Sequence, residues 1–201
     1  MTVIGICGSS GSGKGYVCKL LENYGIKWID TDLVYRGLTG NDTACLRELE
    51  QAFGGAIISE SGALNRVELA KIVFEGENAD ENRAELNRIS HKHIRKETER
   101  LIEIYKNEGA IGVSVDAPVL FESGFDKMCD TTICVTATLE NRIERIIKRD
   151  NVTREKALYR LNCQKTDEEL RALCKYEIDN SNGSDLEKQI EAILTDLCII
   201  N

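Results

Sequence analysis

The sequence has no apolar run that approaches the ~18–20 residues needed to cross a membrane. Its start also lacks the basic-then-apolar pattern of a secretory signal peptide, because a glycine- and serine-rich stretch over residues 8–14 interrupts the opening apolar run. Basic residues are comparatively few: 26 Lys and Arg stand against 34 Asp and Glu, a formal net charge of −8. Nucleic acids and anionic membranes select basic surfaces. We therefore expect a cytoplasmic protein that has neither nucleic acid nor membrane as a partner.

Proline is nearly absent, since Pro118 stands alone where average usage over this length gives about ten. None of the eight cysteines belongs to a C-x-x-C pair, so the spacing typical of zinc sites is missing. A chain of this length buries roughly 70% of its unfolded surface and needs no disulfide framework. Most of the cysteines are therefore expected to be small buried hydrophobic residues.

Short apolar runs and amphipathic segments alternate along the chain. Residues 3–7 predict a buried strand and residues 26–30 a second strand, and residues 14–24 between them carry the spacing of a helix. Three more strands and a closing helix are predicted at residues 111–115, 132–135, 176–179 and 186–197. A strand, a helix and a second strand in this order predict an α/β fold with a parallel, helix-covered sheet.

Two long stretches between these strands have a helical character. Residues 86–105 place their apolar side chains at roughly helical spacing. Residues 142–175 are rich in charge and poor in strand-forming residues. A charged helical hairpin of this kind is either a solvated face or a mobile lid over a nucleotide site, and the residues alone favour neither.

The strongest motif lies between the first predicted strand and the first predicted helix. Residues 8–14, GSSGSGK, satisfy the pattern G-x-x-x-x-G-K in that structural context. Glycines allow successive backbone N–H groups to surround a phosphate chain, and the helix N-terminus adds a partial positive charge. Lys14 would reach the β- and γ-phosphates as a point charge. The motif therefore predicts a phosphate-binding loop.

One position departs from a complete loop of this kind. Gly15 stands where Ser or Thr would offer a hydroxyl to Mg²⁺, and Tyr16 follows it. Either other groups and water hold the metal, or turnover is reduced. Asp116 ends a predicted strand and is a candidate metal ligand, or a capping residue of the next turn. Asp30 and Asp32 follow another strand, where an acid can accept a proton from a hydroxyl or help to hold the metal.

An ordered set of motifs resembles the dephospho-coenzyme A kinase family nearly from end to end. The matching segments are Gly8 to Lys14, residues 29–32 (IDTD), 53–54 (FG), 61–66 (SGALNR), 73–74 (VF), 91–94 (HKHI), 118–124 (PVLFESG), Arg145, Arg149, Asp150, Gln164 and 178–180 (IDN). The resemblance implies a three-layer α/β/α fold of the P-loop kinases, with a five-stranded parallel sheet, a helical substrate-binding insertion and a lid. It also implies ATP-dependent phosphorylation of the ribose 3′-hydroxyl of dephospho-coenzyme A, the final step of coenzyme A biosynthesis, with Mg²⁺ as cofactor.

The resemblance further implies roles for single residues. Asp32 would be the base on the acceptor hydroxyl, Lys14 would act with it in catalysis, and Arg66 and His91 would bind the substrate. The implied ATP-binding residues are Gly8, Ser9, Ser10, Gly11, Ser12, Gly13, Lys14, Gly15, Tyr16, Arg145, Arg149 and Asn180, with Asp116 toward Mg²⁺.

Several of these residues have a plainer alternative. Arg145 and Arg149 lie one helical turn apart, so they can instead pair with Glu144 or Asp150 on a surface. Arg66 can form an ordinary surface ion pair, and His91 can be a polar helix residue.

Two departures from the family pattern bear on the expectations. Lys92 replaces a proline, which we expect to alter mainly how the long helix begins. Cys7 stands where relatives carry a small hydroxyl residue. Its thiol is either exposed, with a pKa lowered by the helix end, and therefore oxidisable, or packed at the strand end.

The expected organisation has a nucleotide-binding core that is interrupted twice. The predicted parts are residues 1–32 (core with the loop), 33–108 (helical substrate region), 109–140 (core), 141–175 (lid) and 176–201 (core). Two other functions stay open: a kinase for another nucleoside or nucleotide, or a non-catalytic nucleotide-binding protein, as Gly15 would allow. The sequence gives no indication of the oligomeric state.

Overall fold

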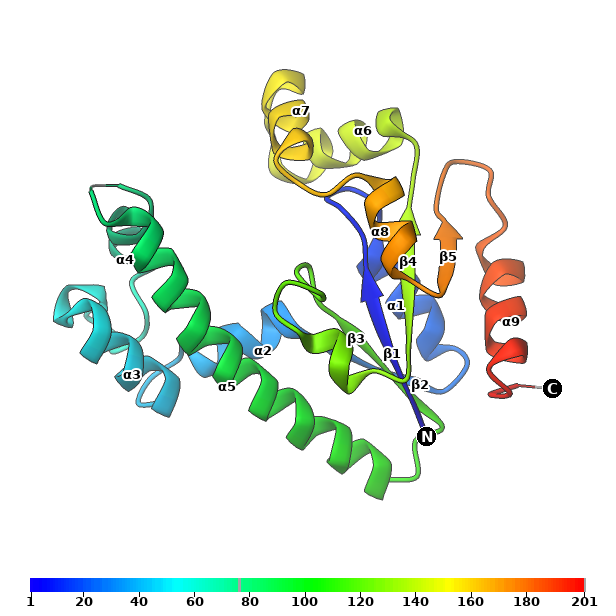
Figure 1. Ribbon diagram of the computed structural model, residues 1–201, viewed down its shortest axis with the longest axis horizontal. Helices are drawn as coiled ribbons and strands as arrows, with labels where there is room; N and C mark the ends of the chain where they lie inside the picture. Colours follow the sequence, from blue (N-terminus) through cyan, green and yellow to red (C-terminus); the bar gives the residue numbers. More distant parts are fainter. Residues whose placement is uncertain (76, 201) are drawn as a thin grey trace. The chain divides into compact units, whose positions relative to one another are not determined.

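The computed structural model describes residues 1–75 and 77–200, and its central feature is a five-stranded parallel sheet (Figure 1). The strands are β1 (Thr2–Cys7), β2 (Ile26–Asp30), β3 (Gly112–Asp116), β4 (Thr131–Thr136) and β5 (Tyr176–Asp179). Their order across the sheet is β2-β3-β1-β4-β5, and every neighbouring pair is parallel. The predicted α/β fold with a five-stranded parallel sheet is therefore confirmed.

The chain divides into two compact units. The first contains Met1–Asp30 and the chain from Ile102 onward, and it holds the whole sheet. The second unit is Thr31–Leu101. No helix in the described part of the chain is long and apolar enough to span a membrane.

One face of the sheet is covered by α1 (Lys14–Glu22) and α9 (Leu186–Asp196). Buried side chains of the two helices and of the strands form one hydrophobic core. The helices contribute Val17, Leu21, Ile190 and Leu194, and the strands contribute Ile4, Ile6, Ile133 and Ile178. Full burial of such a side chain contributes roughly 1.5–3 kcal/mol. This packing anchors α1, whose first turn follows the predicted phosphate-binding loop.

Residues 139–173 form three short helices, where the sequence predicted a charged hairpin. They are α6 (Leu139–Asp150), α7 (Arg154–Asn162) and α8 (Asp167–Leu173). Each begins after a threonine whose side chain accepts a backbone N–H of the first turn, at Thr138, Thr153 and Thr166. α6 and α7 share a small core of Ile143, Ile146, Ala157 and Leu161. The hairpin is thus packed on one side and charged on the other.

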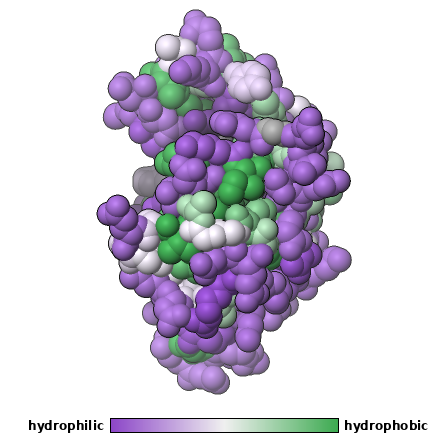
Figure 2. All heavy atoms as spheres, turned by 90° about the vertical axis from the view of Figure 1, so that its left-hand side faces the viewer, coloured by the Kyte–Doolittle hydropathy of each residue, from purple (hydrophilic) through white to green (hydrophobic). Residues whose placement is uncertain are grey.

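The second unit is helical, as the long periodic segment predicts. Its elements are α2 (Thr31–Leu38), α3 (Ala44–Phe53), the 3₁₀ turn η1 (Gly55–Ile57), α4 (Arg66–Phe74) and α5 (Ala79–Asn107), which runs on into the first unit. Its core contains Cys45, Leu49, Ile57, Leu69, Val73 and Ile89. Hydrophilic residues dominate the face seen in Figure 2, with hydrophobic groups between them.

The expectation for Lys92 is wrong, because this residue lies well inside α5 and not at its start. The helix begins at Ala79, and the acidic residues Asp80 and Glu81 in its first turn suit the positive end of the helix dipole. At its actual place Lys92 donates to Glu48 on α3, with 2.8 Å between Nζ and Oε2. His93 also contacts Glu48, with 2.7 Å between Nε2 and Oε2.

We predict that the Glu48→Gln variant unfolds more easily than the parent at neutral pH, by about 1 kcal/mol. Hydrogen bonds from Lys92 and then from His93 lower the pKa of Glu48 from 4.5 to about 2. A lowered pKa in the folded state stabilises the fold above the unfolded pKa, and this stabilisation is lost as the pH falls from about 4.5 to about 2. Urea unfolding across this pH range measures the difference between parent and variant.

The difference should shrink toward zero as the pH falls. The matched control is Glu99→Gln, which removes an exposed carboxylate from α5, the helix that carries Lys92 and His93. If Glu48→Gln and Glu99→Gln had the same free energy of unfolding at pH 7, the contacts of Glu48 with Lys92 and His93 would not stabilise the second unit.

Candidate active site

The loop of residues 8–13 connects the end of β1 to the start of α1. Gly13 is the N-cap of α1 with φ 91°, and a Cβ there would lie 2.1 Å from Nδ2 of Asn180. Gly11 has φ 78°, and a Cβ there would lie 2.6 Å from the carbonyl oxygen of Arg142. Both positions exclude a side chain through backbone conformation and through space. The glycines therefore let other elements approach the loop backbone closely.

Lys14 folds back over this loop. Its Nζ donates to the carbonyl oxygen of Gly8 at 2.8 Å. The first turn of α1 carries no acidic side chain, so the partial positive charge of the helix end is not neutralised there. An ammonium group and a helix N-terminus thus share one loop, which is the electrostatic requirement for holding a phosphate chain.

Two of the other predicted residues hold the loop from outside. Arg145 on α6 donates through Nη1 to the carbonyl oxygens of Gly11 and Ser12, at 3.3 and 3.2 Å. Its Nη2 donates to the carbonyl oxygen of Asn180 at 2.7 Å. Asn180, buried just after β5, donates through Nδ2 to the Ser12 carbonyl at 2.7 Å. The structure thus brings Arg145 and Asn180 to the loop.

Arg149 and Tyr16 are placed differently. Arg149 is exposed and pairs with Asp150, with 2.7 Å between Nε and Oδ1. This is the surface ion pair that the sequence offered as the alternative to phosphate binding. Asp150 also pairs with Arg160 from α7. The Tyr16 side chain is 57% exposed in the first turn of α1.

Arg142 and Asp167 were missed as site residues by the sequence analysis. The buried Arg142 pairs with Asp167 on α8, at 3.0 Å between Nη1 and Oδ1, and donates through Nε to the Ser10 carbonyl at 3.2 Å. Asp167 also accepts from Oγ of Ser9 at 3.1 Å. The Ser10 N–H donates to Oε1 of Gln164 at 2.8 Å. α6 and α8 are therefore fastened to the loop tip.

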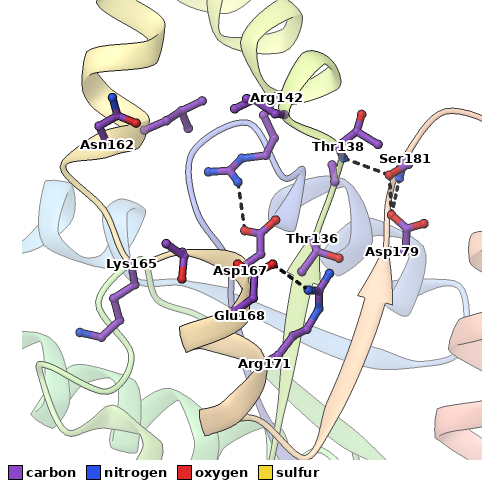
Figure 3. Close-up of a pocket in the computed structure, with 14 residues that line it drawn as sticks. Thr136, Thr138, Arg142, Asn162, Lys165, Asp167, Glu168, Arg171, Asp179 and Ser181 are labelled. Atoms are coloured by element: carbon purple, nitrogen blue, oxygen red, sulfur yellow. Dashed lines mark hydrogen bonds and ion pairs between the residues drawn. The ribbon is translucent and has the colours of Figure 1, made fainter.

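A cavity of about 510 Å³ lies between these helices and the ends of β4 and β5 (Figure 3). Its lining includes three cationic and three acidic side chains: Arg142, Lys165, Arg171, Asp167, Glu168 and Asp179. The dashed contacts in the figure show that cations and carboxylates pair with one another, as Arg142 does with Asp167. Because the charges balance, this cavity does not select a phosphate chain, and the loop remains the candidate phosphate site.

Two carboxylates end neighbouring strands at the carboxyl edge of the sheet. Asp30 of β2 and Asp116 of β3 are register partners, and Asp116 is buried. Mg²⁺ is held by one or two carboxylates, several waters and substrate phosphates, so this pair fits it. Within the described residues no group of three or more His, Cys, Asp and Glu side chains could hold a metal by itself.

Gly15 lies in the first turn of α1, beside the indole of Trp28. A Cβ at Gly15 would lie 3.6 Å from Cη2 and Cζ2 of Trp28, which is ordinary van der Waals contact. A serine therefore fits at this position, and the missing hydroxyl is not enforced by lack of space. Trp28 itself packs against the core under α1, as expected for a strand tryptophan.

The predicted substrate residues all belong to the second unit. Asp32 is exposed in the first turn of α2, two residues after the end of β2. Arg66 begins α4; its Nη2 donates to Oγ1 of Thr39 at 3.1 Å, and its guanidinium lies 5.3 Å from the ring centroid of Tyr35. These contacts replace the surface ion pair considered for Arg66.

His91 is half-buried in α5. Burial, with a smaller contribution from Arg95, lowers the pKa of His91 below its ordinary value of 6.5. The imidazole is therefore neutral at pH 7, so that one ring nitrogen donates and the other accepts.

Cys7 is packed at the strand end, so an exposed thiol with a lowered pKa is the wrong alternative. Its side chain is 1% exposed. Hydrogen bonding to Cys134 and Cys174, together with burial, raises the pKa of Cys7. The effect of these contacts and of burial on the pKa of Cys7 exceeds that of the helix N-terminus that follows the loop.

This chain resembles known proteins over nearly its whole length. A family model described as dephospho-CoA kinase matches residues 2–185. A dephospho-CoA kinase of Corynebacterium diphtheriae is 35% identical over 190 residues, which cover 94% of each chain. The crystal structure of TT1252 from Thermus thermophilus has a TM-score of 0.79 and 31% identity, covering 98% of this chain and 97% of that one.

The fold is also that of a more distant structure. A dephospho-CoA kinase from Campylobacter jejuni, at 22% identity, has a TM-score of 0.69 over 97% of this chain and 96% of its own. The match to the family model covers nearly the whole chain and includes the loop of residues 8–14. This chain therefore belongs to the dephospho-CoA kinase family.

Proposed function

We propose that this protein transfers the γ-phosphoryl group of ATP to the ribose 3′-hydroxyl of dephospho-coenzyme A. The observation that carries the proposal is the GSSGSGK loop in a chain that the dephospho-CoA kinase model matches over residues 2–185. None of the comparisons favours another acceptor or a non-catalytic role. Phosphoryl transfer needs in-line positioning and charge neutralisation more than covalent chemistry, and the loop carries cationic groups suited to charge neutralisation.

The loop and Lys14 act on the phosphate chain. The N-terminus of α1 and backbone N–H groups of the loop, other than those of Ser10 and Ser12, which already donate within the protein, hold the β- and γ-phosphates. Lys14 leaves the Gly8 carbonyl, its partner at 2.8 Å, and moves its ammonium onto the phosphate oxygens. Arg145 and Asn180 keep the loop backbone in place while this exchange occurs. Asn180 would also lie near the adenine.

Asp116 and Asp30 are the residues that would hold Mg²⁺. The ion neutralises charge on the phosphates when bound. Since Gly15 offers no hydroxyl, the remaining ligands would have to be water and phosphate oxygens.

The second unit supplies the acceptor side. Asp32 accepts the proton of the attacking hydroxyl, as a carboxylate within hydrogen-bond reach of the nucleophile can. Arg66 and His91 bind the coenzyme A part of the substrate, and Arg149 exchanges Asp150 for phosphate oxygens. A planar guanidinium suits this exchange, because it bonds two oxygens at once.

An acceptor panel tests the proposed function. Purified protein is incubated with ATP and Mg²⁺ and with dephospho-coenzyme A, adenosine monophosphate, cytidine monophosphate or shikimate, and products are separated by chromatography. We expect rapid ADP formation and a phosphorylated product with dephospho-coenzyme A alone. Transfer to a nucleoside monophosphate, with none to dephospho-coenzyme A, would replace the proposed acceptor. ATP binding without any product would establish a non-catalytic protein.

We predict that Gly15→Ser lowers the half-saturating Mg²⁺ concentration several-fold and raises kcat. The serine hydroxyl would add one oxygen ligand, and the Trp28 ring leaves space for its Cβ. Initial rates across Mg²⁺ concentrations provide the measurement. Gly37→Ser in α2 is the matched control, since no atom lies within 4 Å of a Cβ there. An unchanged Mg²⁺ dependence with intact ATP binding would mean that Gly15 does not limit the metal site.

A further inference from the structure

Three cysteines that are far apart in sequence meet on the face of the sheet opposite α1. Cys7 ends β1 and is the register partner of Cys134 on β4. Cys174 caps the C-terminus of α8. The Sγ atoms of Cys7 and Cys174 lie 3.3 Å apart, although 167 positions separate them in the chain. We call these three residues the thiol cluster.

The members of the thiol cluster differ in exposure and in acidity. Cys7 and Cys134 are buried, whereas Cys174 is partly exposed. Hydrogen bonds from Cys134 and then from Cys7 lower the pKa of Cys174 to about 4, and Thr132 adds to this effect. The same contacts raise the pKa of Cys7. The cluster therefore pairs one accessible thiolate with a second sulfur in contact with it.

Other uses of the cluster are less suited to the geometry. The described residues contain no group of three or more His, Cys, Asp and Glu side chains able to hold a metal ion, so these three thiols do not form such a site. Cys18 is an example of a thiol that packs in the core: it is buried, and its pKa is raised chiefly by burial. Cys174 differs from it in exposure, in the direction of its pKa shift and in its sulfur contact.

We propose that Cys174 and Cys7 form a reversible disulfide when a peroxide oxidises Cys174. The Cys174 thiolate attacks one peroxide oxygen and the O–O bond breaks, which gives sulfenic acid and a hydroxide ion; the hydroxide becomes water by taking a proton from the solvent. The Cys7 sulfur then attacks the sulfur of Cys174; the S–S bond forms, the S–O bond breaks, and the hydroxide leaves as water with the proton of Cys7. Two thiols lose two electrons in total, and one peroxide is reduced to two waters.

The disulfide would disturb the phosphate-binding loop. An S–S bond is about 2.0 Å long, so the two sulfurs must approach by more than 1 Å from their present 3.3 Å. Cys7 directly precedes Gly8, where a Cβ would lie 2.3 Å from the Val135 carbonyl oxygen, so the loop start has no free space. α8, which Cys174 ends, holds the loop through Asp167. We therefore expect weaker nucleotide binding after oxidation, a consequence that rests on the proposed function.

Peptide mapping tests the disulfide without reference to kinase activity. The protein is treated with hydrogen peroxide or with dithiothreitol, remaining thiols are alkylated, and tryptic peptides are analysed by mass spectrometry. Cys7, Cys134 and Cys174 fall in separate peptides, Met1–Lys14, Met128–Arg142 and Ala172–Lys175. We expect peroxide to link the first peptide to the third and dithiothreitol to release them. Absence of this link, or a dominant link to the second peptide, would overturn the proposal.

Variants separate the chemistry from its effect on the loop. Cys7→Ser should leave sulfenic acid at Cys174, which dimedone traps, and Cys174→Ser should abolish both disulfide and trapping. ATP affinity is measured by calorimetry before and after peroxide; we expect a loss of about tenfold in the parent. Cys174→Ser should remove this loss, whereas the matched control Cys198→Ser, at an exposed thiol outside the cluster, should retain it. A disulfide that leaves ATP affinity unchanged would refute the regulatory consequence while leaving the proposed function intact.

Discussion

Replacing Lys14 with methionine is expected to reduce kcat/KM for dephospho-coenzyme A by about 10³-fold. The ammonium of Lys14 folds over the phosphate-binding loop, where it donates to the Gly8 carbonyl. Methionine keeps a flexible chain of similar length but removes the charge that neutralises the β- and γ-phosphates. The fold should tolerate the change, since a single contact at the loop is lost. Steady-state kinetics and thermal melting provide the two measurements.

The matched control is Lys19→Met, which removes an exposed ammonium from the same helix. This variant should keep the parent rate, because Lys19 lies in the last turn of α1. Equal rates for Lys14→Met and the parent would mean that the loop does not act on the transferred phosphoryl group.

Replacing Asp32 with asparagine is expected to lower kcat by about 10²- to 10⁴-fold, with ATP affinity unchanged. Asparagine preserves the shape of the side chain but cannot accept the proton of the acceptor hydroxyl. Asp32 follows the carboxyl end of β2, the sheet edge where ligands bind in open α/β folds. Rapid-quench or steady-state kinetics measure kcat, and calorimetry measures ATP binding.

Asp42→Asn serves as the control for Asp32→Asn. Asp42 is an exposed carboxylate of the second unit with φ 54°, a conformation that asparagine tolerates. Its replacement should leave kcat unchanged. If Asp32→Asn kept the parent kcat, the proton would leave the hydroxyl by another route and Asp32 would not be the base.

Local patterns predicted the parts of this molecule that local physics determines. The apolar run at residues 3–7 corresponds to β1, because a strand buried on both faces needs a continuous apolar segment. Residues 26–30 correspond to β2, an edge strand in which Lys27 is exposed. The GSSGSGK motif predicted the turn between β1 and α1, since glycine is required where φ is positive and space is absent. The fold class followed from the order of these elements.

Contacts between residues that are distant in sequence could not be predicted from local patterns. Arg142 looked like one charge among many in a polar segment, and its burial depends on Asp167, which comes from another helix. Cys134 and Cys174 looked like ordinary core cysteines, because their meeting with Cys7 depends on sheet register and on where α8 ends. The pairing of β1 with β4 sets that register, and no short motif encodes it.

The most direct test of the account is the position of the phosphate in the product made from ATP and dephospho-coenzyme A. The reaction is run with Mg²⁺, and the product is examined by phosphorus NMR with correlation to the ribose protons. We predict a new phosphomonoester coupled to the proton on the ribose 3′-carbon, formed in step with ADP and about 10³-fold more slowly with Lys14→Met. Phosphate at any other position, or ATP consumed without a phosphorylated acceptor, would contradict it.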